Sequence, residues 1–140
     1  MSRTSAPIVT VDGPSGSGKG TLSSALGHVL GWTVLDSGSL YRAIALEIWR
    51  KKIEVREAEE PEISELLNSL SIELKGEKVF LNGEDISEDI RTEEIGAKAS
   101  KIASNPKLRR GILDFQRSFI SLPGLVADGR DMGCLLYTSD

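Results

Sequence analysis

Residues Gly13–Thr21 have the types and spacing needed to bind phosphate groups. They read GPSGSGKGT and contain the G-x-x-x-x-G-K part of a P-loop. Its glycines let backbone N–H groups face phosphate oxygens, while the lysine reaches the outer phosphates. A plain strand-to-helix turn is the alternative, but it would need neither the lysine nor four glycines. The expected nucleotide-binding residues are Gly13, Pro14, Ser15, Gly16, Ser17, Gly18, Lys19, Gly20 and Thr21.

The residue after the lysine indicates which class of P-loop protein the sequence resembles. Gly20 stands where Ser or Thr normally holds Mg²⁺, and Thr21 follows one position later. The sequence G-K-G-T resembles the corresponding motif of nucleoside monophosphate kinases. The sequence has no N-K-x-D guanine motif and no Walker B segment with a catalytic acid, which argues against a GTPase or a motor-type ATPase. Phosphoryl transfer to a bound nucleotide needs alignment, Mg²⁺ and positive charge, so arginines should complete the site.

Two further polar segments meet this expectation. Asp36–Arg42 reads DSGSLYR and follows a short apolar run, and Asp128–Gly133 reads DGRDMG and follows the run GLVA. If both runs are parallel strands, both segments leave the carboxyl ends of the sheet, where ligands of such sheets bind. The two segments are therefore expected to face the same crevice as the P-loop.

Taken together, the three motifs closely resemble those of the bacterial cytidylate kinase family, over about Pro7–Gly133. General adenylate kinases share the G-K-G-T loop but lack the other two motifs. The resemblance implies an enzyme of pyrimidine nucleotide metabolism that phosphorylates CMP and dCMP to CDP and dCDP with ATP and Mg²⁺. It also implies a cytoplasmic protein that is a monomer at full length and has neither a nucleic acid polymer nor a membrane as partner.

The resemblance also assigns roles to individual residues. Ser37 and Asp131 would hydrogen-bond the cytosine, with a further base contact from Ser100. Arginine guanidinium groups suit a phosphate because they bind it through two parallel hydrogen bonds. The acceptor phosphate would be held by Arg42, Arg109 and Arg130. The catalytic set would be Lys19, Arg130 and Asp128, and the metal would be held by Thr21 and by Asp128, through water.

Some of these residues have simpler alternatives. Asp36 and Asp128 could be caps at strand ends, since aspartate is common at the start of a following helix. Arg109 lies beside Arg110 on a helix that carries further basic residues, so a solvated basic face is the alternative there.

The composition excludes other kinds of site. One cysteine and one histidine cannot form a Cys/His zinc site or a disulfide framework, which fits a reducing, cytoplasmic compartment. With 17 basic and 21 acidic residues the net charge is −4, so the chain lacks the basic balance of a nucleic acid binder. No stretch approaches the roughly 20 apolar residues that span a bilayer, and we recognise no export signal.

The pattern of the chain predicts elements that would position the motifs. A strand at Pro7–Val11, a helix ending at Gly31 and a strand at Trp32–Leu35 form a βαβ unit. The first helix has an apolar stripe that should face the core: Leu22, Ala25, Leu26, Val29 and Leu30. Further helices are expected at 39–52, with Trp49 on the inward face, at 63–70, at 92–104, with Thr92 as its cap, and at 105–120. Strands are expected at 71–75, 79–81 and 85–87, with turns at Gly76–Glu77 and Asn82–Gly83, and a last buried strand at 124–127.

The resulting fold class is α/β: a P-loop NTPase-like, three-layer α/β/α arrangement with a parallel sheet, incomplete here. A small antiparallel acceptor-binding subdomain is inserted at about residues 61–90. By the same resemblance, residues 7–133 would form the N-terminal part of a kinase domain, and residues 134–140, which depart from the family pattern, are interpreted as a foreign or aberrant tail.

The resemblance implies that the chain is truncated at its C-terminus. In the family's sheet the third strand lies between the first two, and family members continue with two more strands beside the first strand and with an arginine-bearing lid. Ile8, Val9 and Val11 would then lie on an exposed apolar edge, and we expect aggregation and no kinase activity from the chain alone. Three hypotheses stay open: a CMP or dCMP kinase, an inactive nucleotide-binding fragment, and a P-loop kinase for another small acceptor such as adenylate or shikimate.

Overall fold

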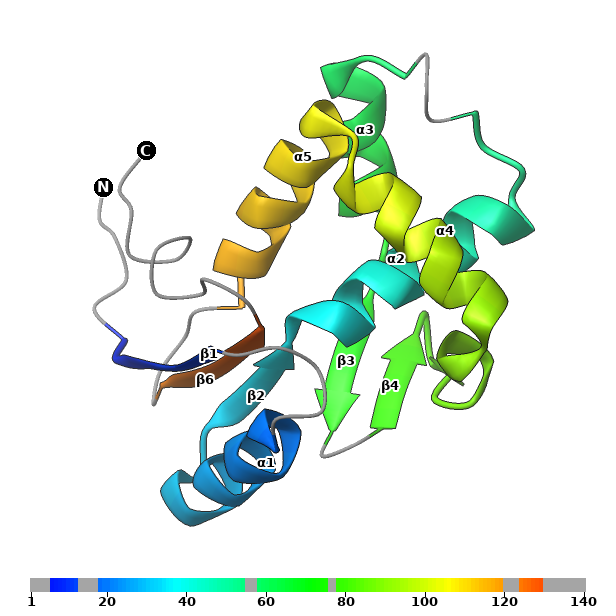
Figure 1. Ribbon diagram of the computed structural model, residues 1–140. Helices are drawn as coiled ribbons and strands as arrows, with labels where there is room; N and C mark the ends of the chain where they lie inside the picture. Colours follow the sequence, from blue (N-terminus) through cyan, green and yellow to red (C-terminus); the bar gives the residue numbers. More distant parts are fainter. Residues whose placement is uncertain (1–5, 13–17, 55–57, 76–77, 120–123, 130–140) are drawn as a thin grey trace. The chain divides into compact units, whose positions relative to one another are not determined.

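The computed structural model describes residues 6–12, 18–54, 58–75, 78–119 and 124–129 (Figure 1). The chain divides into two compact units. Unit 1 consists of residues 1–37, 74–77 and 116–140, and unit 2 consists of residues 38–73 and 78–115. Within the described ranges, no helix is long and apolar enough to cross a membrane.

The elements follow the predicted order, with bounds that shift by a few residues. The strands are β1 (Ile8–Asp12), β2 (Thr33–Asp36), β3 (Ile72–Lys75), β4 (Lys78–Leu81), β5 (Glu84–Asp85) and β6 (Leu125–Gly129). The helices are α1 (Lys19–Leu30), α2 (Ser37–Arg50), α3 (Glu60–Asn68), α4 (Glu93–Ala103) and α5 (Pro106–Arg117), with a short 3₁₀ turn, η1, at Asp89–Arg91. The chain is thus a mixed α/β protein, as predicted.

Unit 1 is built on a parallel sheet with the strand order β1-β6-β2. All five residues of β6 are buried, because the strand has a neighbour on each side. The order agrees with the predicted placement of the last strand between the first two. The predicted exposure of β1 is only partly correct: Ile8 and Val9 are half-buried, whereas Val11 is buried.

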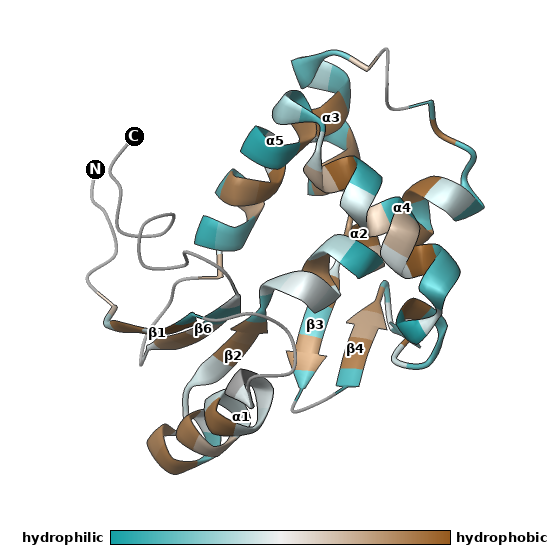
Figure 2. Cartoon of the chain, viewed as in Figure 1, coloured by the Kyte–Doolittle hydropathy of each residue, from teal (hydrophilic) through white to brown (hydrophobic). Residues whose placement is uncertain are grey.

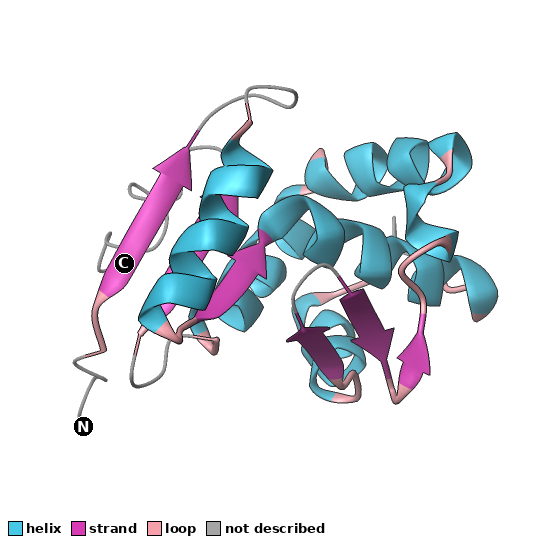
Figure 3. Cartoon of the chain, turned by 90° about the horizontal axis from the view of Figure 1, so that it is seen from below, coloured by secondary structure: helices cyan, strands magenta, loops and turns pink. Residues whose placement is uncertain are grey.

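Helix α1 packs on this sheet through small residues (Figures 1 and 3). Ser23 and Gly27, one turn apart, are buried. A Cβ atom on Gly27 would overlap the Val34 side chain of β2, so the close approach of helix and strand depends on this glycine. Gly31 ends the helix in the left-handed conformation, with φ of 71°, as predicted.

The predicted core-facing stripe of α1 is wrong in the structure. Val29 is 78% exposed, and Leu22 and Leu30 are 52% and 41% exposed. Figure 2 colours much of this helix as hydrophobic. The reason is that the close contact with β2 selects the face with the smallest side chains, which turns the larger apolar side chains to the surface.

Unit 2 is organised around α2, whose buried face includes Leu40, Ala43 and Ile44. The neighbouring helices begin with side-chain caps. Thr92 Oγ1 accepts the Ile95 N–H at 3.2 Å at the start of α4, as predicted, and Asn105 Oδ1 accepts two backbone N–H groups at the start of α5. These caps fix where the helices begin, and therefore which faces they present.

The second sheet has the strand order β3-β4-β5. β4 and β5 are antiparallel and are joined at Asn82 and Gly83, whose φ angles are 51° and 87°. Two successive positive φ angles are typical of a type I′ hairpin turn, for which Asn-Gly is the preferred sequence. The antiparallel hairpin predicted within 61–90 is therefore present, and the Gly76–Glu77 turn lies outside the described residues.

Candidate active site

The described part of the P-loop forms the start of α1. Gly18 precedes the helix with φ of 88°, a left-handed conformation that favours glycine. No side chain caps the helix there, and its first turn carries no acidic residue. Free N–H groups at a helix start attract anions. Gly20 and Thr21 lie exposed in this turn, whereas Gly13, Pro14, Ser15, Gly16, Ser17 and the side chain of Lys19 lie outside the described residues.

The parallel sheet positions Asp128 beside the first turn of α1. It lies near the carboxyl end of β6, opposite Val11 of β1 and Asp36 of β2 in the strand register. The residue is 3% exposed, and its Oδ2 atom lies 3.9 Å from the position that a Cβ atom on Gly20 would occupy. The buried carboxylate of Asp128 therefore faces the first turn of α1.

This arrangement fits a magnesium ion bound together with nucleotide phosphates. The described residues contain no group of three or more His, Cys, Asp or Glu side chains that could hold a metal alone. Mg²⁺ does not need one, since it is usually bound by one or two carboxylates, several waters and substrate phosphates. Asp128 supplies a carboxylate of the required type, with Thr21 in the adjacent turn.

Ser37 begins α2 directly after β2 and has a partner that the sequence did not reveal. Gln116, near the end of α5, donates a hydrogen bond from Nε2 to Ser37 Oγ at 3.0 Å. Gln116 is only 2% exposed, so this is a buried amide in unit 1. Its spacing offers a signal: Leu108, Ile112 and Gln116 recur every four residues on α5, so the glutamine occupies a position of the buried face.

In unit 2, Arg42 lies against α4. Its Nη2 atom is 3.4 Å from the position that a Cβ atom on Gly96 would occupy. Ser100 lies one helical turn further along α4 and is exposed. Residues four apart share one face of a helix, so Ser100 lies on the same face of α4 as Gly96, which Arg42 approaches.

Arg109 reaches α2 from α5. Its guanidinium group lies near the hydroxyl of Tyr41, the residue before Arg42, and acts on its ionisation. Burial raises the pKa of Tyr41 above its ordinary value of 10.0. The Arg109 side chain acts in the opposite direction, because its positive charge favours the ionised tyrosine. Arg109 is exposed, but this contact means that it is not only part of a solvated basic face. Arg130 and Asp131 lie outside the described residues.

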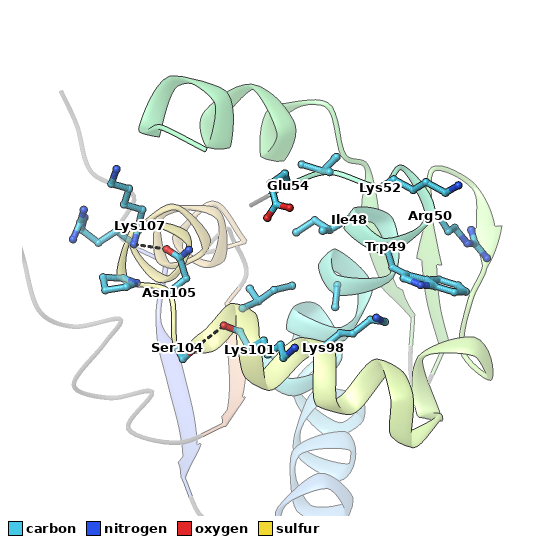
Figure 4. Close-up of a pocket in the computed structure, with 15 residues that line it drawn as sticks. Ile48, Trp49, Arg50, Lys52, Glu54, Lys98, Lys101, Ser104, Asn105 and Lys107 are labelled. Atoms are coloured by element: carbon cyan, nitrogen blue, oxygen red, sulfur yellow. Dashed lines mark hydrogen bonds between the residues drawn. The ribbon is translucent and has the colours of Figure 1, made fainter. Parts of the chain in front are cut away.

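A large hollow in unit 2 does not coincide with the predicted acceptor residues (Figure 4). It has a volume of about 1180 Å³ and lies between the last turns of α2, α4 and the start of α5. Its lining includes Trp49, which is 49% exposed and has the Lys98 ammonium 5.8 Å from its ring centre. Arg42, Ser100 and Arg109 are not among its lining residues. The predicted acceptor residues therefore lie outside this hollow.

A sequence profile described as cytidylate kinase matches residues 9–139 of this chain. The matched range extends into residues 134–140, the segment interpreted from the sequence as a foreign or aberrant tail. The interpretation of that segment stays a prediction.

Several curated proteins are similar to nearly the whole chain. The cytidylate kinase of Bordetella pertussis is 45% identical over 132 residues, which cover 94% of this chain and 58% of the relative. That of Aeromonas hydrophila is 47% identical over 134 residues, with the same coverage. That of Aliivibrio salmonicida is 47% identical over 136 residues, or 94% of this chain and 60% of the relative. The chain thus spans somewhat less than two thirds of the length of these relatives.

Proposed function

Because this chain belongs to the cytidylate kinase family, we propose that the protein transfers the γ-phosphate of ATP to CMP or dCMP, forming CDP or dCDP. The observation that carries the phosphoryl-transfer part is the position of Asp128 beside Gly20. Phosphoryl transfer relies on positioning and on compensating negative charge. A buried carboxylate next to a glycine-rich helix start is the arrangement that holds a metal ion against nucleotide phosphates.

Unit 1 would supply the ATP side of the reaction. The N–H groups at the start of α1 would donate to the phosphates, and Lys19 would reach the outer phosphates. Asp128, through water, and Thr21 would hold Mg²⁺. When bound, this ion compensates the charge of the phosphate oxygens. The buried position of Asp128 keeps its carboxylate oriented towards the helix start.

Unit 2 would supply part of the acceptor side. Arg42 and Arg109 would bind the acceptor phosphate, since guanidinium groups form paired hydrogen bonds with phosphate oxygens. Ser100 would contact the base. Beyond the described residues, Arg130 would also bind the acceptor phosphate and Asp131 would accept from the cytosine amino group. These substrates place the reaction in the cytoplasm, with neither nucleic acid polymer nor membrane as partner.

The decisive experiment measures ADP release by the enzyme extended to the length of its relatives, in the presence of ATP, Mg²⁺ and one of four acceptors: CMP, dCMP, UMP or AMP. This chain alone is expected to release none. CMP and dCMP should stimulate ADP release, and Lys19→Ala should abolish it. Stimulation by AMP, or by shikimate in a parallel assay, would favour the hypothesis of another small acceptor. ADP release that persists in Lys19→Ala would contradict the proposal.

The roles of two carboxylates can be separated with a matched pair. Asp12 and Asp128 lie near the carboxyl ends of neighbouring strands, but Asp12 is exposed and Asp128 is buried beside Gly20. Asp128→Asn should weaken ATP binding in the presence of Mg²⁺, measured by calorimetry, much more than Asp12→Asn does. Equal effects of the two substitutions would remove Asp128 from the metal site.

The inactive nucleotide-binding hypothesis is tested by the same calorimetry. A chain that binds ATP with Mg²⁺ and binds CMP, but releases no ADP, would support binding without catalysis. Arg109→Ala should then weaken CMP binding, whereas Arg110→Ala should not, because the Arg110 guanidinium pairs with Glu60 at 3.1 Å instead.

A further inference from the structure

The buried amide of Gln116 restricts what the Ser37 hydroxyl can do. Gln116 Nε2 donates to Ser37 Oγ at 3.0 Å, and among the described residues this is the hydroxyl's one hydrogen bond. The amide is 2% exposed, and it is held by α5 while Ser37 is held by the start of α2. In the structure the amide nitrogen, rather than the amide oxygen, faces the serine, and close packing restricts the rotation of the side chain.

The direction of this hydrogen bond determines whether the Ser37 hydroxyl donates a hydrogen bond to a ligand or accepts one from it. A hydroxyl group has one hydrogen to donate and two lone pairs to accept with. The amide N–H occupies one lone pair, and the hydroxyl hydrogen cannot point at another hydrogen. It must therefore turn away from Gln116, and Ser37 is prepared to donate to a ligand.

From this geometry we propose that Gln116 is a positioning residue for base selection: it makes Ser37 a donor to the N3 atom of cytosine and thereby disfavours uracil. The inference rests on the proposed function and on the contact with the cytosine that the family resemblance assigns to Ser37. Cytosine N3 is an unprotonated acceptor, whereas uracil carries a hydrogen on N3. With uracil, the N3 hydrogen would face the Ser37 hydroxyl. The hydroxyl hydrogen would then have no acceptor on the base, so the hydroxyl would be left with an unsatisfied donor.

The test compares the affinities of the chain for CMP and UMP by calorimetry. Gln116→Glu keeps the shape of the side chain but replaces the donating amide by an accepting carboxylate. Ser37 would then donate to that carboxylate and offer only lone pairs to the base. The ratio of CMP to UMP affinity should fall by about tenfold or more. CMP and UMP carry the same phosphate charge, so general repulsion by the new carboxylate cancels in the ratio.

Two further variants separate positioning from a loss of folding. Gln116→Met removes the hydrogen bond without adding an acceptor, and it should lower the ratio by a smaller factor. In a Ser37→Ala background, Gln116→Glu should leave the ratio unchanged, since the two residues act as one unit. Thermal unfolding identifies any variant that fails to fold, and the conclusion then rests on the other variant.

The outcomes are distinct. A chain that binds CMP, but whose CMP to UMP ratio stays constant in both Gln116 variants, overturns the inference and leaves the proposed function standing. A ratio that changes equally with and without Ser37 also overturns it, because Gln116 would then act by another route. A wild-type chain that binds neither nucleotide contradicts the proposed function and this inference together.

Discussion

The Arg109 guanidinium on α5 lies near the hydroxyl of Tyr41 on α2, one residue before Arg42. Two of the three arginines predicted to bind the acceptor phosphate are thus linked through adjacent positions of one helix. Tyr41 is half-buried, and its burial raises the pKa of its hydroxyl. The cation of Arg109 opposes this rise, because a nearby positive charge favours the ionised tyrosine.

This contact predicts how the pKa of Tyr41 responds to substitution. Arg109→Leu should raise the pKa of Tyr41 further, because it removes the group that favours the ionised form. Titration by ultraviolet absorbance, in a Tyr137→Phe background, measures Tyr41 alone. A folded-state pKa above the ordinary value also means that Tyr41 supports stability below pH 10.0 and that this contribution is lost as the pH rises through the folded-state pKa.

The control for this titration is Arg110→Leu. Arg110 is the next residue on α5, and its guanidinium pairs with Glu60 of α3 instead. The pKa of Tyr41 should not move in this variant. A Tyr41 titration that is unaffected by Arg109→Leu would show that the two side chains do not interact in solution.

The contact between Gly27 and Val34 predicts a destabilising Gly27→Ala substitution. A Cβ atom on Gly27 would overlap the Val34 side chain, so helix and strand must move apart, at a cost of about 1–3 kcal/mol. An uncrowded helical glycine behaves in the opposite way, since alanine there stabilises a helix by about 1 kcal/mol. The sign of the change in unfolding free energy, measured by urea denaturation, therefore tests the packing directly.

A matched control lies on the same helix. Ser24 is exposed on α1, and Ser24→Ala should change the free energy of unfolding only slightly. Combining Gly27→Ala with Val34→Ala, which removes the clashing methyl groups, should recover part of the lost stability. An additive combination would point to a different cause.

The exposed apolar side chains of α1 predict self-association of this chain. Leu22, Val29 and Leu30 are each more than 40% exposed, and adjacent apolar surface of this kind promotes association. Val29→Lys should lower the apparent mass of the sample in sedimentation experiments without reducing helix content by circular dichroism. A wild-type chain that is monodisperse and unfolds cooperatively would contradict this prediction.

Much of the fold was predictable because its signals are local. The glycine at position 31, the cap at Thr92 and the Asn82–Gly83 turn each specify a conformation through their own backbone preferences, and each appears where predicted. The position of Asp128 at the carboxyl end of a parallel strand followed from the βαβ pattern. Strand and helix bounds differ by a few residues because the last turns depend on tertiary contacts.

The remaining features depend on tertiary contacts, which the hydrophobic pattern of one segment does not reveal. The apolar stripe of α1 predicted a buried face, but the helix rests on Ser23 and Gly27, since only small side chains permit its approach to β2. Trp49 was expected on the inward face of α2 and is half-exposed. Gln116 was missed because a polar residue on a buried face becomes meaningful only when its partner, Ser37, is known.

The strand order β1-β6-β2 has a consequence for how the protein is made. β1 and β2 are complete by Asp36, yet the strand that joins them begins only at Leu125. During synthesis β1 and β2 cannot join the sheet until β6, their common neighbour, has been made. The residues of unit 2, by contrast, have all been translated before β6 emerges. Unit 2 can therefore fold first. The parallel sheet, which carries Asp128 beside the start of α1, would form last because it has to close the longest loop.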